Sequence, residues 1–172
     1  MKRFCFLIGL VILLSGCGSR AVWETVEDPL PTTEVSSWLE EAYTIQIGVP
    51  ERMDLLAEQE GCSLYSNADG SFEVETRVFL TAGLADAVQK LSGYKLEELN
   101  LLETTRFDLP EYQFSWVSQT ERGLMISRAD LVLEEQCCYA VICSSLESVG
   151  NDYDGQVREV LATFGLSRDE TV

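Results

Sequence analysis

Residues 100–145 have the sequence NLLETTRFDLPEYQFSWVSQTERGLMISRADLVLEEQCCYAVICSS, in which four apolar segments follow one another along the chain. The predicted strands are Leu101–Phe107, Tyr112–Ser118, Leu124–Leu133 and Cys137–Ser145. Their polar connectors are Asp108–Pro110, Thr120–Gly123 and Glu134–Gln136. Because such connectors are too short for the crossover that parallel strands need, the stretch predicts an antiparallel meander.

Two of these strands are apolar on both faces, most clearly at Leu131–Leu133 and Cys138–Ile142. Helices packed on both faces of the sheet would explain this pattern. On the second strand, Tyr112, Phe114 and Trp116 alternate on one face. We expect these rings to build the core rather than to line a sugar site.

The segment before the meander predicts a strand and a hairpin. Tyr43–Val49 alternates apolar and polar residues, as a half-buried strand does, and Pro50 ends it. Cys62–Ser66 and Phe72–Phe79 are expected to pair through the turn-forming residues Asn67–Gly70.

Residues 51–61, between that strand and the hairpin, fit either a helical or a loop insertion, and the sequence leaves both alternatives open. After the hairpin, Leu84, Val88 and Leu91 lie at i, i+4 and i+7, which predicts a short helix. Thr81 is its expected cap, and Gly93 is placed where glycine often ends a helix.

The chain closes with its clearest helical pattern. Asn151 or Asp152 is the expected cap, and Gly165 is the expected end of the helix. Its apolar stripe consists of Tyr153, Val157, Val160, Leu161 and Phe164.

This order of elements resembles the PsbP-like fold, named for the extrinsic photosystem protein. The resemblance depends on Tyr43–Pro50 as the opening strand and Leu84–Leu91 as the middle helix. It also depends on Tyr139–Ile142 and on the helix that ends at Phe164–Leu166. It implies, over residues 40–166, an α+β fold with an antiparallel sheet of about six to seven strands flanked by helices on both faces. Members of that fold are mostly non-catalytic accessory or binding proteins, which implies such a role here.

The first twenty residues, MKRFCFLIGLVILLSGCGSR, resemble the export signal of a bacterial lipoprotein. Lys2 and Arg3 give a basic start, and Phe4–Leu14 is an apolar run too short to span a bilayer. Leu14–Cys17 resembles the lipobox, which implies cleavage just before Cys17 and diacylglycerylation of its thiol. An ordinary secretory signal and an uncleaved anchor are the alternatives.

The chain is therefore expected to have three parts. Residues 1–16 are the signal peptide, residues 17–34 are the lipidated N-terminus and a flexible acidic tether, and residues 35–172 are a single α+β domain. The expected location is the extracytoplasmic side of the cell membrane, with lipid on Cys17 as the anchor.

The charge of the chain excludes several classes of partner. Its 12 Lys and Arg residues against 29 Asp and Glu residues give a net charge of −17, and loss of Lys2 and Arg3 with the signal takes it to −19. Such a surface opposes binding to DNA, RNA and anionic lipid headgroups. We expect the lipid anchor to hold the protein to the membrane, and an envelope protein to be its partner.

The chain has no histidine, which excludes Ser-His-Asp catalysis and histidine-based zinc sites. Beyond the signal and the lipidation site, four cysteines remain: Cys62, Cys137, Cys138 and Cys143. One prediction is a disulfide between Cys62 and one of the other three, and four free buried thiols are the alternative. The absence of a C-x-x-C pair argues against a zinc site.

No motif assigns a catalytic residue, a metal or a cofactor. Ser92–Lys95 matches S-x-x-K, but it lies at a predicted helix end and the partner motifs are missing. Asn67–Gly70 and Asp152–Gly155 each resemble half of a calcium loop, but neither has the required first and last ligands.

The sequence therefore predicts a membrane-anchored, non-enzymatic accessory domain that binds a protein. One alternative is a solute- or ion-binding lipoprotein, which a pocket with convergent polar groups would favour. The other is a cryptic hydrolase that uses carboxylates or Cys62. A carboxylate with a raised pKa in a cleft, or a thiol with a lowered pKa, would favour the hydrolase.

Overall fold

The computed structural model describes residues 42–168, which contain nine strands and two α-helices. The strands are β1 (Thr44–Gln46), β2 (Met53–Gln59), β3 (Cys62–Asn67), β4 (Phe72–Leu80), β5 (Leu102–Arg106), β6 (Leu109–Thr120), β7 (Gly123–Glu134), β8 (Cys137–Leu146) and β9 (Gly165–Ser167). The helices are α2 (Leu84–Ser92) and α3 (Gly150–Thr163), with 3-10 helices η1 (Leu96–Glu98) and η2 (Glu147–Val149).

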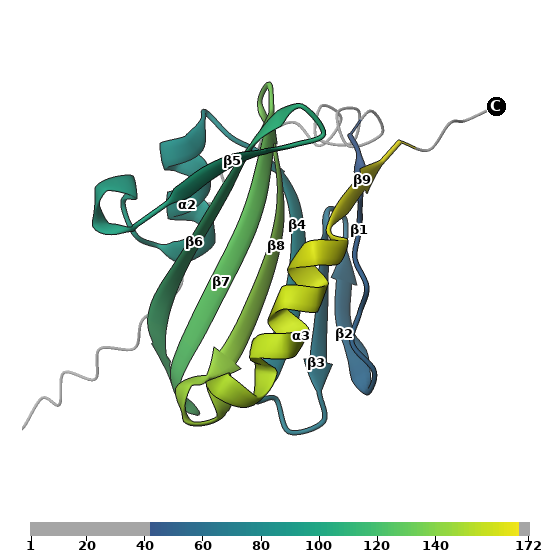
Figure 1. Ribbon diagram of the computed structural model, residues 1–172, viewed down its shortest axis with the longest axis vertical. Helices are drawn as coiled ribbons and strands as arrows, with labels where there is room; N and C mark the ends of the chain where they lie inside the picture. Colours follow the sequence, from purple (N-terminus) through teal and green to yellow (C-terminus); the bar gives the residue numbers. More distant parts are fainter. Residues whose placement is uncertain (1–41, 169–172) are drawn as a thin grey trace, which may run out of the picture. The chain divides into compact units, whose positions relative to one another are not determined.

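Seven strands form one antiparallel sheet in the order β2-β3-β4-β8-β7-β6-β5 (Figure 1). β1 and β9 form a separate two-stranded antiparallel sheet. The described residues therefore confirm an α+β fold with a seven-stranded antiparallel sheet.

The predicted meander is confirmed, because β5, β6, β7 and β8 pair in succession. Its first connector is shorter than predicted: β6 begins at Leu109, and Pro110 pairs with Thr105. Only Phe107 and Asp108 form the turn, with φ angles of 53° and 63°. Two left-handed residues match the twist of paired strands, which explains why two residues are enough for this turn.

The predicted hairpin through Asn67–Gly70 is confirmed as β3 and β4. The N–H of Gly70 donates to the carbonyl of Asn67 at 3.0 Å, and the N–H of Ser71 donates to Asp69 Oδ1 at 2.9 Å. Gly70 has a φ of 67°, which glycine adopts without a steric penalty. β4 also pairs with β8 along its whole length, and this pairing joins the hairpin to the meander.

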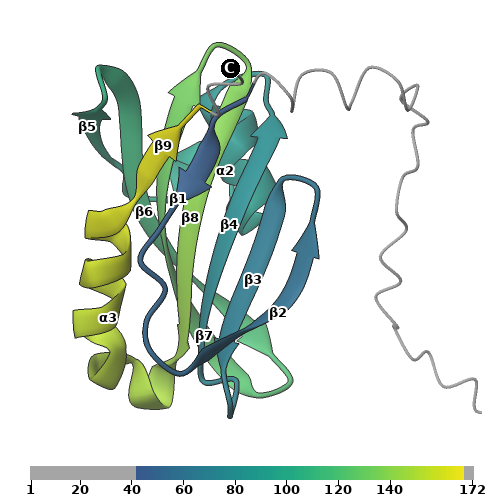
Figure 2. The same ribbon diagram turned by 90° about the vertical axis from the view of Figure 1, so that its right-hand side faces the viewer.

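Residues 51–61 contain a strand, so both the helical and the loop alternative are wrong. β2 pairs antiparallel with β3 and lies at one edge of the sheet (Figure 2). A register shift between Leu55 and Ala57 marks a bulge in β2. The pairing with β3 explains the strand, because tertiary contacts override the helical preference of Leu, Ala and Glu.

The strand predicted at Tyr43–Val49 is confirmed only over Thr44–Gln46. It pairs with β9 rather than with the seven-stranded sheet, and Ile45 lies opposite Leu166. The alternation of apolar residues is explained by packing, since Tyr43, Ile45 and Ile47 contact the hydrophobic core.

α2 confirms the predicted short helix, but its N-cap is Gly83 and not Thr81. Thr81 Oγ1 instead donates to the carbonyl of Gly83 at 2.8 Å, and Asp86 Oδ2 accepts from the N–H of Ala82 at 2.9 Å. Gly93 follows the helix as predicted, with a φ of 78° and its N–H bonded back into the last turn at 2.8 Å.

α3 confirms the predicted C-terminal helix and ends before Gly165, as expected. It begins at Gly150 with Val149 as its N-cap, so the expected cap at Asn151 or Asp152 is wrong. The reason is η2, which passes directly into α3 and leaves no turn at the expected position.

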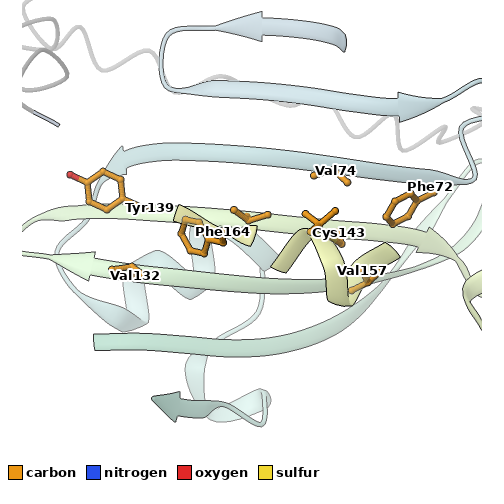
Figure 3. Packing of buried hydrophobic residues seen from close by; sticks show 9 residues of the cluster. Phe72, Val74, Val132, Tyr139, Cys143, Val157 and Phe164 are labelled. Atoms are coloured by element: carbon orange, nitrogen blue, oxygen red, sulfur yellow. The ribbon is translucent and has the colours of Figure 1, made fainter. Parts of the chain in front are cut away.

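The core consists of two hydrophobic clusters. The buried members of the first are Phe72, Val74, Val132, Tyr139, Val141, Cys143, Val157, Val160 and Phe164 (Figure 3). Those of the second are Ala87, Val88, Leu91, Phe114, Ala129, Leu131, Cys138, Ala140 and Ile142. Successive residues of β8 alternate between the two clusters, which explains why Cys138–Ile142 is apolar on both faces.

The expectation that the rings on β6 build core is also confirmed. Phe114 is buried, and Tyr112 and Trp116 pack against the second cluster. The rings of Phe114 and Trp116 are stacked with centroids 5.4 Å apart.

Candidate functional site

The predicted signal peptide at residues 1–16, the lipidation site Cys17 and the tether up to residue 34 lie outside the described residues. Within residues 42–168, no helix has the length and apolarity needed to cross a membrane.

The four cysteines of the described chain are free thiols. Cys62 lies on β3, whereas the other three cysteines, Cys137, Cys138 and Cys143, lie on β8. Strand β4 lies between β3 and β8. Two strand spacings separate β3 from β8 by roughly 10 Å, whereas a disulfide needs Cα atoms within about 7 Å. This arrangement favours the free-thiol alternative, and Cys138 and Cys143 act as small apolar core side chains.

The motifs that were weighed for chemistry have local structural roles. Ser92 Oγ donates to the carbonyl of Val88 at 2.7 Å in the last turn of α2. Asp69 closes the β3–β4 turn, and Asp152 and Asp154 lie within α3. In the part of the chain that the structure describes, no three Cys, Asp or Glu side chains are grouped to hold a metal ion.

Cys62 lies where two surface depressions meet, at the turn between β2 and β3. One has a volume of about 400 Å³ and is lined by β1 and by both sides of this turn. The other, of about 450 Å³, extends from the turn to Phe79 and Lys90. The thiol of Cys62 donates to Glu75 Oε1 at 3.6 Å, and burial together with this carboxylate raises the pKa of the thiol. A raised pKa keeps the thiol protonated, which makes it a poor nucleophile at neutral pH.

Two carboxyl groups are buried beside the C-terminal end of α3. Arg106 Nε donates to Glu111 Oε1 at 2.5 Å, and Arg106 Nη2 donates to Asp130 Oδ2 at 3.1 Å. The side chains of Glu111 and Asp130 are 5% and 0% exposed. Burial, followed by the neighbouring Glu111, raises the pKa of Asp130 to about 8. Neither carboxyl group lines the depressions at Cys62, and both belong to a buried ion cluster with Arg106.

Edge strand β2 is an exposed feature that could bind a partner. Among the described residues it pairs only with β3, so its other side presents backbone N–H and C=O groups without strand partners. Leu55 and Leu56 are 47% and 62% exposed, and Leu56 stands at the bulge. The opposite edge strand, β5, is shorter, and its exposed apolar side chains are Leu102 on the strand and Phe107 in the turn that follows it.

Carboxylates surround the two leucines of β2. Asp54 and Glu58 lie on the strand, and Glu51 and Glu60 lie just beyond its ends. None of the four forms an ion pair with another residue of the described chain. We call residues 51–60 the acidic edge, because they combine an unpaired strand backbone, two exposed leucines and these carboxylates.

Sequence reasoning missed both the acidic edge and the buried ion cluster. The edge was missed because residues 51–61 were not recognised as a strand. The sequence does indicate the cluster, because Asp130 stands between the apolar residues Ala129 and Leu131. A charged side chain within an apolar strand needs a partner.

Comparison with known proteins shows the fold but no family. No family model matches the chain, and no curated protein matches it. LpqN, which is involved in cell envelope biogenesis of Mycobacterium tuberculosis, has a similar structure with a TM-score of 0.50 and 12% identity, over 73% of this chain and 84% of LpqN. At this identity the likeness to LpqN shows the fold alone.

Two further solved structures also match. The cyanobacterial PsbP protein (CyanoP) of Synechocystis sp. PCC 6803 matches with a TM-score of 0.49 and 9% identity, over 73% of this chain and 93% of CyanoP. A protein of Bacteroides thetaiotaomicron VPI-5482 matches with a TM-score of 0.49 and 14% identity, over 73% of this chain. The chain spans less than half of that protein, 46% of its length.

Proposed function

We propose that this protein is a membrane-anchored extracytoplasmic lipoprotein whose domain is non-enzymatic and binds an envelope protein at the acidic edge. The observation that carries the proposal is the outer side of β2, which has no strand partner within residues 42–168 and exposes Leu55 and Leu56. An extended segment of a partner would add a strand there, with main-chain hydrogen bonds for affinity and side-chain contacts for specificity.

The chemistry of the edge defines the partner segment. The exposed leucines require apolar side chains opposite them, and the carboxylates at Glu51, Asp54 and Glu58 require Lys or Arg. A second copy of this chain fits poorly, because pairing of two β2 strands would place carboxylates close to carboxylates. Like charges opposite one another destabilise a strand pair.

We also infer that the domain is a PsbP-like sandwich in which α2 and α3 cover opposite faces of the sheet. Two observations support this inference: β8 alternates between the clusters to which the two helices contribute, and the helices lie on different sides of β8 in both views (Figures 1 and 2). LpqN, which shares the fold, is involved in cell envelope biogenesis, and we propose an envelope role for this protein as well.

The membrane attachment is proposed to depend on lipid at Cys17, with residues 17–34 as the tether. Cys17→Ala is expected to release the protein from membranes that are washed with carbonate. Wild-type protein should stay in the membrane pellet under the same wash. Equal retention of both proteins would contradict the anchor while leaving the binding proposal open to its own test.

Charge reversal of the acidic edge tests the binding proposal. Asp54→Lys with Glu58→Lys is expected to lower cross-linking of the lipidated protein to its partner in intact cells at least tenfold. The matched control is Glu97→Lys with Glu121→Lys, which reverses two exposed carboxylates elsewhere on the chain. The proposal requires the control to retain the cross-linked partner. Equal loss in both variants, or no loss in the first, would contradict it.

A further inference from the structure

Arg106 connects β5 to three other elements of the fold. Besides Glu111 on β6 and Asp130 on β7, it donates to the last turn of α3: Arg106 Nη1 to the carbonyl of Phe164 at 2.8 Å, and Nη2 to that of Leu161 at 3.4 Å. The guanidinium carbon lies 5.1 Å from the ring centroid of Phe164. A cation at this position also interacts favourably with the negative end of the helix dipole.

The charges of this cluster balance only when one proton is present. One cation, Arg106, faces two carboxyl groups, Glu111 and Asp130, and both carboxyl groups are buried. Asp130 Oδ2 accepts from Arg106 and from Gln113 Nε2 at 3.2 Å, whereas Asp130 Oδ1 is buried without any hydrogen-bond partner among the described residues. Two ionised carboxylates would leave a net negative charge out of contact with water, which is costly.

We propose that this cluster is a proton-dependent latch: a proton held between Glu111 and Asp130 keeps the last turn of α3 and β9 on the sheet, and loss of that proton releases them. The proposal is independent of the binding function proposed above. It depends on the way one arginine joins the end of α3 to buried carboxyl groups on two strands.

Neighbouring strands carry other ionisable side chains. On β8, burial raises the pKa of both Tyr139 and Cys143, so both side chains stay neutral. On β7, Arg128 forms an ion pair with Asp154 of α3, with Nη2 2.8 Å from Oδ1, and both side chains of this ion pair are well exposed. The carboxyl pair therefore provides the proton of the latch, in agreement with the raised pKa of Asp130.

Release of the latch would also change the structure of the surface depression that β1 lines. β9 follows α3 directly and pairs with β1, and β1 lines the 400 Å³ depression beside the β2–β3 turn. Opening at the end of α3 would therefore loosen one wall of that depression.

Amide hydrogen exchange of the full-length protein in detergent tests the latch. After correction for intrinsic exchange rates, the protection of residues 161–168 is expected to fall by up to tenfold for each pH unit as the pH rises toward 8, and to level off above pH 8. Protection of α2, residues 84–92, is expected to fall only as far as the free energy of global unfolding falls over the same pH range, and therefore less than that of residues 161–168. An equal fall in protection in both segments would overturn the proposal, because it would report global unfolding alone.

Variants distinguish a latch that depends on a proton from an ion pair whose structure does not change with pH. Asp130→Asn is neutral at every pH, so it should keep residues 161–168 protected up to pH 9. Glu111→Gln replaces it if the first variant does not fold. Asp154→Asn, which removes an exposed carboxylate nearby, should retain the wild-type pH dependence. A neutral variant that still loses protection as wild type does would overturn the latch.

Discussion

At the scale of single residues, Arg106 is the cation that two buried carboxyl groups share. Arg106→Met would leave Glu111 and Asp130 without a counter-charge, and breaking a buried pair in this way costs about 3–5 kcal/mol. Arg158→Met is the control, because Arg158 is exposed and forms no ion pair with another described residue. Its expected effect is below about 0.5 kcal/mol. Urea unfolding measures both changes, and equal losses would contradict the structural role of Arg106.

The pH dependence of stability is a second prediction at this scale. Burial and Glu111 raise the pKa of Asp130 to about 8, so the folded state keeps a proton that an unfolded Asp loses near pH 4. The folded state therefore binds more protons between these values, and the free energy of unfolding falls as pH rises from 5 to 8. Asp130→Asn should flatten this slope in urea titrations at pH 5 and pH 8. An unchanged slope would show that Asp130 does not hold the proton.

At the scale of elements, two glycines provide a matched test of helix structure. Gly93 follows α2 with a φ of 78°, and a Cβ there would meet no atom within 4 Å. Gly93→Ala should therefore cost about 1 kcal/mol through backbone strain alone. Gly155 lies inside α3 and is equally free of contacts. Gly155→Ala should stabilise the protein by about 0.5–1 kcal/mol, because alanine favours a helix. Thermal unfolding measures both changes in stability, and we expect them to have opposite signs. A change of the same sign in both variants would contradict the helix assignments.

The elements also show how far the sequence predicts the fold. The strands β5–β8 follow from their apolar pattern and short connectors, and α3 follows from its apolar stripe. β2 does not, because Asp54–Glu58 has a composition that suits a helix and becomes a strand only through its pairing with β3. The pairing of β4 with β8 joins residues far apart in sequence, and no local pattern specifies that partner.

The candidate sites were less predictable than the elements. Exposure of Leu55 and Leu56 depends on β2 being at an edge, which is a property of the strand order. The buried ion cluster depends on Arg106 meeting Asp130 across β6, although the unusual position of Asp130 is visible in the sequence. Local periodicity reports which residues face a core, but it does not report which charged residues meet there.

At the scale of the whole molecule, we propose that a lipid-anchored N-terminus holds an acidic domain whose described residues expose a strand edge at β2. The net charge of −17 disfavours nucleic acids and anionic lipid surfaces as partners. It favours a partner segment that carries Lys or Arg, and the acidic edge places carboxylates around two exposed leucines for such a segment.

Site-specific photo-cross-linking in intact cells tests this central claim most directly. A photoreactive residue replaces Leu56 on the edge or, as a control, Val117 on β6, which is 45% exposed. We predict that position 56 gives an adduct with one envelope protein, and that mass spectrometry maps it to an extended segment rich in Lys or Arg. Absence of an adduct at position 56, or the same adduct at position 117, would contradict binding at β2.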